Sequence, residues 1–523
     1  MSNGLDTSRP ELVFALVGAA GVRLDDLTQR LKNELSRFSY TTIDVRLSDL
    51  LPNYSGWTSQ PSKGEFGRIT HLQNMGNRFR NDLKDGAALA RAGISRIREL
   101  RAGISGSPDT PASAHAYLVR QLKHPSEVDL LRRVYGSSFL LIAGHAPEDL
   151  REVDLSKRMA DKDMKGGQFG KYRSDAAQAI NADEKQEDDF GQNTRDTYPK
   201  ADFFVNLGID QGESELERFV DLLFGHPFRT PTPEEYAMYQ ASAAALRSSD
   251  YSRQVGAAIV SLSRDLHSKI RNADVIAVGM NEVPRGGGGY YWEKDSPDSR
   301  DQALLRRGDD RAAQIKVSAL SELLQRIINK RWLRDEIGGK DANDLAVELL
   351  PDLKRTQFMD IGEFSRPVHA ETSALIDAAR RGVAVDGHSM YVTTFPCHNC
   401  AKHIIAAGLS RVIYLEPYPK SRATHLYAEE LALDSRDGRA QEGKVVFAVF
   451  SGVAPRQYRQ LFSMSERGTK QGLSLQEWET SRSQLVPLHV PKSAFRTSLA
   501  EERRAMETLD PAVYDWDRKK ICP

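Results

Sequence analysis

Two short motifs in the second half of the chain restrict its fold more than any other feature. H-A-E (369–371) and P-C-H-N-C (396–400) each stand where a helical pattern begins. These patterns stop at Gly382 and Gly408, and a glycine just past a helical run is a common C-terminal signal. The sequence thus predicts two helices that begin at chemically reactive residues.

A strand-like run follows each predicted helix, at 390–395 and at 412–415. This order predicts a βαβ arrangement in which both motifs lie at adjacent helix N-termini. A helix N-terminus carries partial positive charge and free N–H groups, so it favours cysteine in its thiolate form.

His369, Cys397 and Cys400 are the predicted ligands of one catalytic zinc ion. Zinc prefers thiolate and imidazole ligands in a tetrahedron, and a catalytic site leaves one position for water. Glu371 lies too close to His369 in sequence to be a further ligand, but is well placed to face that water. We expect this carboxylate to carry protons between the water, the substrate ring nitrogen and the departing ammonia. H-x-E…P-C-x-x-C is the signature of zinc deaminases that attack C4 of cytosine.

The alternative is a closed structural zinc site, which needs a fourth protein ligand. His398 and His403 are the candidates. We favour the catalytic site, because His398 lies inside the C-x-x-C and His403 lies one turn into the helix.

The composition is that of a cytoplasmic protein. There are 523 residues with a formal net charge of +0, and 3 cysteines, of which Cys522 has no evident partner. An extracellular disulfide framework needs more cysteines, and a membrane span needs a longer apolar run than any here. Net charge gives no reason to expect a nucleic acid or a membrane as partner.

The N-terminal part predicts a doubly wound α/β domain over residues 10–228. A buried-strand pattern at 12–17 precedes a glycine-containing turn and a helical pattern at 24–35. Further strand candidates follow at 41–45, 139–144 and 201–206, with long helical segments between 64 and 102.

The turn after the first strand resembles a nucleotide-binding P-loop, but departs from it. The motif G-x-x-x-x-G-K-[ST] requires a lysine followed by a hydroxyl, and neither is present at 18–25. Gly18, Gly21 and Arg23 could still hold a nucleotide, with or without Mg²⁺, through backbone N–H groups. We favour a nucleotide-sensing or regulatory domain over a kinase, and a purely structural turn is the alternative.

Three further segments organise the chain. The polar stretch 147–200 is read as a mobile insertion, or alternatively as a lid that brings Arg158, Arg173 or Arg195 onto phosphates. A proline-rich hinge at 227–233 separates the first domain from a deaminase domain at 232–465, which has a mostly helical insertion at about 285–360. Residues 466–523 are taken as a C-terminal extension.

Residues 232–465 resemble the deoxycytidylate deaminase branch of the cytidine deaminase superfamily. The resemblance rests on the zinc motifs, on R-S-S-D and R-Q-V-G-A (247–257), and on G-M-N-E-V-P (279–284). It implies a three-layer α/β/α domain in which Asn281 contacts the nucleoside. A turn-forming role is the alternative for Asn281.

Most of residues 10–465 also resemble the bacterial anti-phage dCTP deaminases, which join a P-loop-like domain to a deaminase. The shared segments are L-K-H-P-S-E-V (122–128), G-G-G-Y-Y-W (287–292), E-P-Y-P-K-S (416–421) and S-G-V-A-P-R-Q-Y (451–458). The resemblance implies conversion of free dCTP or dCMP to the deoxyuridine nucleotide, with depletion of dCTP during infection. It also implies a homo-oligomer and allows for a regulatory RNA.

Lys420, Ser421 and Arg456 are the residues predicted to bind the substrate phosphates. Lysine or arginine with a hydroxyl suits phosphate, and the first two follow a predicted strand. A solvated basic loop is the alternative. Two other functions are the alternatives: a deaminase of bases in tRNA or single-stranded DNA, and a regulatory or toxin protein that only binds nucleotide. Neutral charge disfavours the first, and the intact Glu371 disfavours the second.

Overall fold

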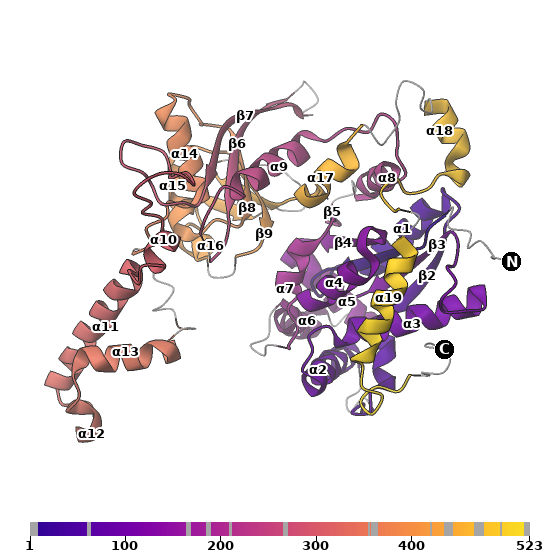
Figure 1. The fold of residues 1–523 in the computed structure, drawn as a ribbon, viewed down its shortest axis with the longest axis horizontal. Coiled ribbons are helices and arrows are strands. Elements are labelled where there is room, and N and C mark those ends of the chain that lie inside the picture. The colour runs from indigo at the N-terminus through magenta and orange to yellow at the C-terminus, as the bar shows by residue number, and fades with distance from the viewer. Residues whose placement is uncertain are drawn as a thin grey trace. The chain divides into compact units, whose positions relative to one another are not determined.

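The structure is a computed structural model of the chain (Figure 1). It describes residues 9–59, 64–163, 169–184, 190–208, 212–250, 252–264, 270–353, 356, 364–418, 421–433, 443–464, 475–491 and 494–516. Lys420, one of the predicted phosphate ligands, and Cys522 lie outside these residues. No helix of the described residues is long and apolar enough to cross a membrane.

The chain forms two compact units. The first comprises the described residues within Met1–Tyr239, Tyr414–Pro417 and Ala432–Pro523, and the second comprises those within Gln240–Ile413 and Tyr418–Leu431. Both zinc motifs therefore belong to the second unit, and the P-loop-like turn belongs to the first.

A six-stranded sheet forms the centre of the first unit. Its strand order is β12-β5-β4-β1-β3-β2, and all neighbours are parallel except β12, which is antiparallel to β5. The predicted strands at 12–17, 41–45, 139–144 and 201–206 are confirmed, whereas β3 was not predicted. The strands are β1 (Leu12–Val17), β2 (Thr41–Arg46), β3 (His115–Arg120), β4 (Phe139–His145), β5 (Phe203–Asn206) and β12 (Gly452–Val453).

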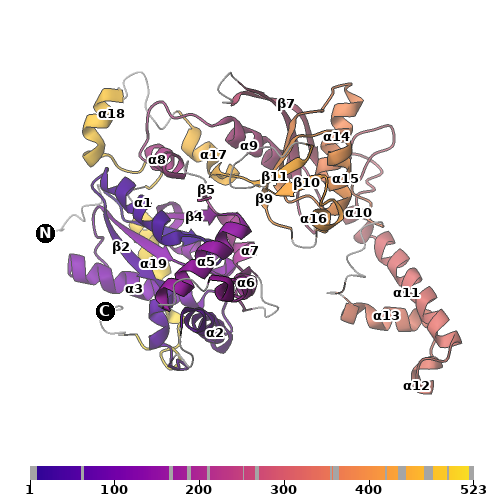
Figure 2. The same ribbon diagram turned by 180° about the vertical axis from the view of Figure 1, so that it is seen from behind.

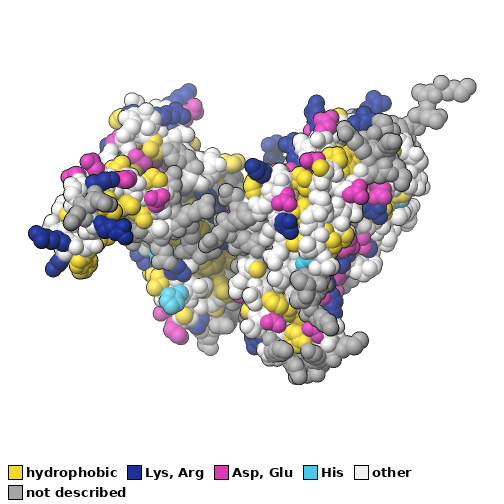
Figure 3. All heavy atoms as spheres, turned by 90° about the horizontal axis from the view of Figure 1, so that it is seen from below, with side chains coloured by type: hydrophobic (Ala, Val, Ile, Leu, Met, Phe, Trp, Pro, Cys, Tyr) yellow, Lys and Arg dark blue, Asp and Glu magenta, His cyan; other side chains and the backbone are white. Residues whose placement is uncertain are grey.

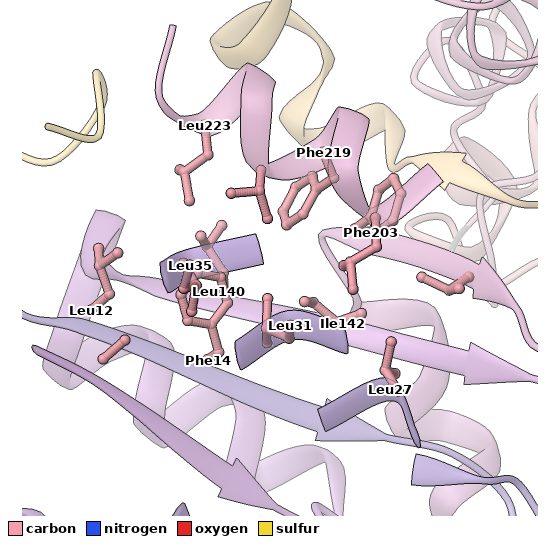
Figure 4. Packing of buried hydrophobic residues seen from close by; sticks show 14 of the residues in the cluster. Leu12, Phe14, Leu27, Leu31, Leu35, Leu140, Ile142, Phe203, Phe219 and Leu223 are labelled. Atoms are coloured by element: carbon pink, nitrogen blue, oxygen red, sulfur yellow. The ribbon is translucent and has the colours of Figure 1, made fainter. Parts of the chain in front are cut away.

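Helices cover this sheet, as a parallel sheet requires. The helices α1 and α8 share one apolar core with the central strands, where Leu27, Leu31 and Phe219 are fully buried (Figure 4). The helical elements up to α8 are α1 (Leu24–Ser36), η1 (Leu47–Asn53), α2 (Glu65–Leu83), α3 (Ala88–Ser105), α4 (Pro125–Tyr135), η2 (Gly136–Ser138), α5 (Glu148–Lys162), α6 (Phe169–Glu184), α7 (Thr194–Thr197), η3 (Tyr198–Lys200) and α8 (Gly212–Leu223).

The polar stretch 147–200 is folded in its described residues, so its reading as a mobile insertion was wrong. Helices α5 and α6 pack together through a small core that includes Leu155, Met159, Tyr172 and Ile180. Alanines at helical spacing supply the rest of the apolar face. The segment contains few large aliphatic residues because a close pair of helices needs only small ones at the contact.

A second six-stranded sheet lies at the centre of the zinc-motif region, with the order β10-β11-β9-β8-β6-β7 (Figure 2). Strand β6 is antiparallel to both β7 and β8. The predicted strands of this region are confirmed. The elements are β6 (Gly256–Arg264), β7 (Ile270–Met280), β8 (Ser389–Thr394), β9 (Arg411–Glu416), β10 (Leu431–Leu433) and β11 (Val445–Val449).

Two glycines let helices approach opposite faces of this sheet. A Cβ at Gly256 would overlap the backbone of α9 (Pro233–Ala245), and a Cβ at Gly279 would overlap that of α14 (Ala370–Arg380). Gly256 pairs with Met280, and neighbouring residues of a strand face opposite sides, so Gly279 faces the side opposite to Gly256. Helices thus cover both faces.

The remaining helices of the second unit include the predicted helical insertion. Helices α11 and α13 pack on each other through Leu320, Leu324 and Leu345. The elements are α10 (Asp301–Leu305), α11 (Arg311–Asn329), α12 (Asp335–Gly338), α13 (Ala342–Leu353), α14, α15 (His398–Ala406) and α16 (Ala423–Leu426).

The C-terminal segment is part of the first unit and is anchored by buried charges. It contributes α17 (Pro455–Phe462), α18 (Leu475–Ser481), η4 (Arg482–Gln484) and α19 (Ala494–Glu507). Glu502 of α19 is fully buried and accepts hydrogen bonds at 2.8 Å from Arg98 Nη1 and from Arg101 Nη2 of α3. Burial opposes ionisation of Glu502, but attraction to these arginines outweighs it and lowers the pKa of Glu502.

We predict that Glu502→Gln destabilises the first unit by about 3–5 kcal/mol, because it leaves two buried guanidinium groups without their shared carboxylate. Thermal unfolding at neutral pH measures the loss of Tm. A carboxylate with a depressed pKa stabilises the fold above its unfolded pKa of about 4.3, and this contribution disappears as the pH falls through the folded value. The Tm difference from wild type should therefore narrow in acid. The exposed Glu507→Gln on the same helix is the control, and equal Tm values for the two variants would contradict the prediction.

Candidate active site

The two predicted motifs occupy the N-termini of α14 and α15. His369 is the N-cap residue of α14 and Cys397 that of α15, and both have extended backbone angles with ψ of 153° and 164°. An N-cap side chain leaves the helix axis at the end where N–H groups are free. Cys400 follows in the first turn of α15 and is buried.

The three predicted ligands lie together. His369 Nδ1 is 3.3 Å from Cys397 Sγ and 3.4 Å from Cys400 Sγ, and all three ligand atoms lie within 4.8 Å of one another. Nitrogen and sulfur ligands of a tetrahedral zinc ion are about 3.6 Å apart, from the usual bond lengths. The donor set and its spacing therefore fit zinc.

The group contains three potential ligands among the described residues, and neither His398 nor His403 belongs to it. The alternative of a closed site completed by one of these histidines is not supported. Three protein ligands leave one position of a tetrahedron for water or substrate.

The three potential ligand side chains form hydrogen bonds with one another, and these bonds shift their pKa values. Hydrogen bonds from Cys400 and His369 lower the pKa of Cys397 to about 4. The same contact with Cys397 raises the pKa of His369 to about 9. The Cys400 thiol, hydrogen-bonded to Cys397 and buried, has a raised pKa. Metal binding at such a group releases its protons, so affinity depends on pH.

Glu371 lies in the first turn of α14 and is only 4% exposed. Burial, followed by the charge of Cys397, raises the pKa of Glu371 to about 7. A carboxyl group with a pKa near neutrality can both accept and donate a proton under physiological conditions.

A cavity of about 400 Å³ opens at these residues. His369, Glu371 and Cys397 line it together with Asn281. Its further lining residues include Asp250, Ser252, Arg253, Val255, Phe395 and Tyr418. The volume lies in the range of small-molecule sites. All of these residues belong to the second unit.

Asn281 is buried in the wall of this cavity, and its amide bonds to backbone. Its Nδ2 donates to the Arg253 carbonyl at 2.7 Å, and its Oδ1 accepts from the Val255 N–H at 2.7 Å. The side chain therefore fixes the segment before β6, of which Arg253 and Val255 also line the cavity. These bonds to backbone agree with the turn-forming alternative, and the contact of Asn281 with the nucleoside stays a prediction.

Ser421 and Arg456, the two predicted phosphate ligands that the structure describes, each bond to other parts of the protein. Ser421 donates its hydroxyl to the Pro396 carbonyl at 2.8 Å, next to Cys397. Arg456 belongs to the first unit, where its Nε lies 3.3 Å from Asp202 Oδ1. Neither residue lines the cavity.

Among the P-loop-like residues, Gly21 lines a second cavity, in the first unit, whereas Gly18 and Arg23 do not. Gly21 has a φ of +93° and lies against the backbone of Arg151, where a Cβ would not fit. Arg23 is half exposed and pairs with Asp26 and Asp154.

Sequence reasoning did not assign the cavity residues Asp250, Ser252, Arg253 and Tyr418. A signal was present, because the segment 247–257 carries part of the family resemblance. Their place among the lining residues depends on how distant segments pack together, which the sequence pattern alone does not reveal.

The region that contains this site is similar to known deaminases. Residues 231–416 match the family described as the cytidine and deoxycytidylate deaminase zinc-binding region. The match contains His369, Cys397 and Cys400, so the three potential ligands lie in the part of the chain that is similar to this zinc-binding region.

Curated relatives match over short stretches. ComE operon protein 2 of Bacillus subtilis (strain 168) is 45% identical over 67 residues, which cover 13% of this chain and 33% of the relative. Deoxycytidylate deaminase of Enterobacteria phage T2 is 44% identical over 55 residues, covering 10% and 29%. Deoxycytidylate deaminase of Mus musculus is 35% identical over 83 residues, covering 16% and 46%. The chain thus spans less than half the length of each.

Among solved structures, the apo dCMP deaminase from the cyanophage S-TIM5 aligns with a TM-score of 0.21 and 16% sequence identity. The alignment covers 42% of this chain and 99% of that chain.

We predict that His369→Ala and Cys397→Ser each reduce zinc from one ion per chain to near zero, because two remaining protein ligands bind the metal far more weakly. Elemental analysis of the purified full chain measures the ratio. His403→Ala is the matched control, since this exposed histidine of α15 lies outside the ligand group. Full zinc occupancy in Cys397→Ser would refute the assignment.

Proposed function

We propose that this chain deaminates free deoxycytidine nucleotides, dCTP or dCMP or both, to deoxyuridine nucleotides. The observation that carries the proposal is the convergence of His369, Cys397 and Cys400 beside the buried Glu371, where His369, Glu371 and Cys397 line a cavity of about 400 Å³. When bound there, zinc supplies the activation of a water molecule at neutral pH.

Glu371 performs the proton transfers of this reaction. It takes a proton from the attacking water and gives it to the ring nitrogen N3, while a bond forms between water oxygen and C4. It then passes the second water proton to the amino nitrogen as the C4–N bond breaks. The products are ammonia and the uracil ring, so atoms and protons balance. The burial of Glu371 keeps these protons away from solvent.

A nucleotide, rather than a free base, requires a cation for its phosphate. Arg253 is an exposed cation among the lining residues of the cavity. Its backbone carbonyl accepts a hydrogen bond from Asn281 Nδ2 at 2.7 Å. This bond fixes the backbone of Arg253 at the cavity. We therefore assign Arg253 to the phosphate group, alongside the predicted role of Asn281.

Two lines of support favour a deoxycytidine nucleotide. Several of the matching relatives are named deoxycytidylate deaminase. The sequence resemblance to anti-phage dCTP deaminases adds dCTP as a substrate and its depletion as a defence. On the face drawn in Figure 3, basic and acidic side chains of the described residues are interspersed, which suits a small substrate better than a nucleic-acid strand.

We predict that Glu371→Gln lowers kcat by about 10²–10⁴-fold, the usual contribution of a positioned acid–base group. Zinc-loaded protein is incubated with dCTP, dCMP, CTP, cytidine and single-stranded DNA, and uracil products are followed by chromatography. Asp377→Asn is the matched control, because it also replaces a carboxylate by an amide. Asp377 lies further along α14 and does not line the cavity. Turnover of DNA alone would overturn the proposal in favour of a nucleic-acid editor.

We predict that Arg253→Ala raises KM for the preferred nucleotide at least tenfold, while kcat/KM for cytidine changes less than twofold. The reason is that only the nucleotide carries a phosphate for the guanidinium to bind. Steady-state kinetics on both substrates provide the measurement. Arg381→Ala is the control, since Arg381 pairs with Asp377 at 3.2 Å and lies outside the cavity. Equal losses on nucleotide and nucleoside would contradict the assignment.

A further inference from the structure

The side chain of Thr372 links the two helices that carry the predicted zinc ligands. Thr372 follows Glu371 in the first turn of α14, and its Oγ1 lies 3.6 Å from Sγ of Cys400 in α15. Sulfur is larger than oxygen, so a hydrogen bond to sulfur is longer than one to a carbonyl or a carboxylate. The contact therefore joins α14 to α15 at one of the ligand atoms.

A threonine in a helix often bonds to its own backbone instead. Its hydroxyl can donate to a carbonyl one turn earlier, as Thr480 of α18 does to the Gln476 carbonyl at 2.9 Å. Thr372 Oγ1 makes no such bond, and Cys400 is its one hydrogen-bond partner among the described residues. The usual local bond therefore does not account for the direction of this hydroxyl.

The two cysteines differ in their access to hydrogen-bond donors. Cys397 is partly exposed and is the N-cap residue of α15, where the free N–H groups of the first turn can reach its sulfur. Cys400 is only 2% exposed, so water has little access to it. A buried anion without a donor costs free energy. Cys400 is thus the ligand that needs a donor from elsewhere in the protein.

The direction of the hydrogen bond follows from the protonation state of the sulfur. In a free thiol either atom could be the donor. Cysteine binds zinc as a thiolate, which has no proton to give, so the Thr372 hydroxyl must then donate. The other close partner of Cys400 is His369 Nδ1 at 3.4 Å, which is itself a predicted ligand. Ligand atoms that all bind one metal ion cannot also bond to one another, whereas Thr372 is outside the ligand group and can keep its bond.

We propose that Thr372 is a positioning residue of the zinc centre, whose hydroxyl donates to the Cys400 thiolate, fixes the orientation of this ligand and takes up part of its negative charge. The inference rests on the proposed function, because it requires the zinc ion of that site. Thr372 does not line the deaminase cavity, so it acts through Cys400 and not by contact with the substrate. Residues that orient metal ligands typically contribute about 10–100-fold to metal affinity.

Competition with a chromophoric chelator measures the zinc affinity of the full chain in the absence of substrate. We expect Thr372→Val to weaken zinc binding by about tenfold or more, because valine keeps the shape of threonine and lacks the hydroxyl. Thr372→Ser keeps the hydroxyl and should bind zinc within about twofold of the wild type. Thr480→Val is the matched control, because it makes the same change at an exposed threonine of α18.

Substitution of Co²⁺ for zinc gives a readout that a purely structural role would not change. Tetrahedral Co²⁺ with thiolate ligands has a charge-transfer band in the near ultraviolet. A hydrogen bond to sulfur lowers the energy of the sulfur electrons that take part in this transition. Loss of the bond in Thr372→Val should therefore move the band to longer wavelength, and Thr372→Ser should restore its position.

Thermal unfolding of the metal-free proteins verifies that each variant folds. If Thr372→Val does not fold, the comparison of Thr372→Ala with Thr372→Ser decides the question. Zinc affinity and band position equal to wild type in Thr372→Val, or equal losses in Thr372→Val and Thr372→Ser, would overturn the proposal.

Turnover of dCMP by the zinc-loaded wild type, measured in parallel, separates this inference from the proposed function. Neither the zinc affinity nor the cobalt spectrum requires a substrate. A wild type that binds zinc but turns over no nucleotide contradicts the proposed function alone, whereas a wild type that binds no zinc overturns both.

Discussion

The candidate zinc centre depends on how closely helix α14 approaches strand β7. At Gly279 any side chain would overlap the backbone of α14 at Ala370 and Ala374, so only glycine permits this packing. The overlapped turn is the one that begins at His369 and carries Glu371. If the helix were displaced outward, the imidazole would leave the two thiols, and the carboxyl group would leave the cavity wall. A single absent methyl group thus sets the positions of both the metal ligand and the proton carrier.

Two buried glutamates show how neighbours decide the behaviour of a charge. Glu502 and Glu371 are both almost inaccessible to solvent. Two arginines surround Glu502 and lower its pKa, so it serves as a permanent anion that fastens α19 to α3. Glu371 has a thiolate nearby instead, and its pKa is raised to about 7. Burial is the same in both cases, and the difference between a structural and a chemical role lies in the surrounding charges.

The sequence indicated that His369, Cys397 and Cys400 would lie together, as the structure shows, because an N-cap residue and the residues of the first turn lie on one side of a helix end. The proton-carrying role of Glu371 stays a prediction. The sequence also predicted most strands, which read as short apolar runs. It did not predict that Arg456 would pair with Asp202 in the first unit, or that Ser421 would bind the Pro396 carbonyl. Those contacts depend on long-range packing, as does the apolar face of α6, where alanines replace the large residues that a core is expected to contain.

The position of α19 has a consequence for synthesis. Residues 240–431 of the second unit are nearly continuous in sequence, so this unit has most of its contacts as soon as that stretch leaves the ribosome. The first unit begins earlier but remains incomplete for longer, because Arg98 and Arg101 receive their shared carboxylate only when Glu502 emerges, about 400 residues later. The order in which the two units mature is therefore the reverse of the order in which they begin. During that interval the nascent chain carries a second unit that has most of its contacts and a first unit that is still incomplete, and this interval is when a chaperone would have the most to protect.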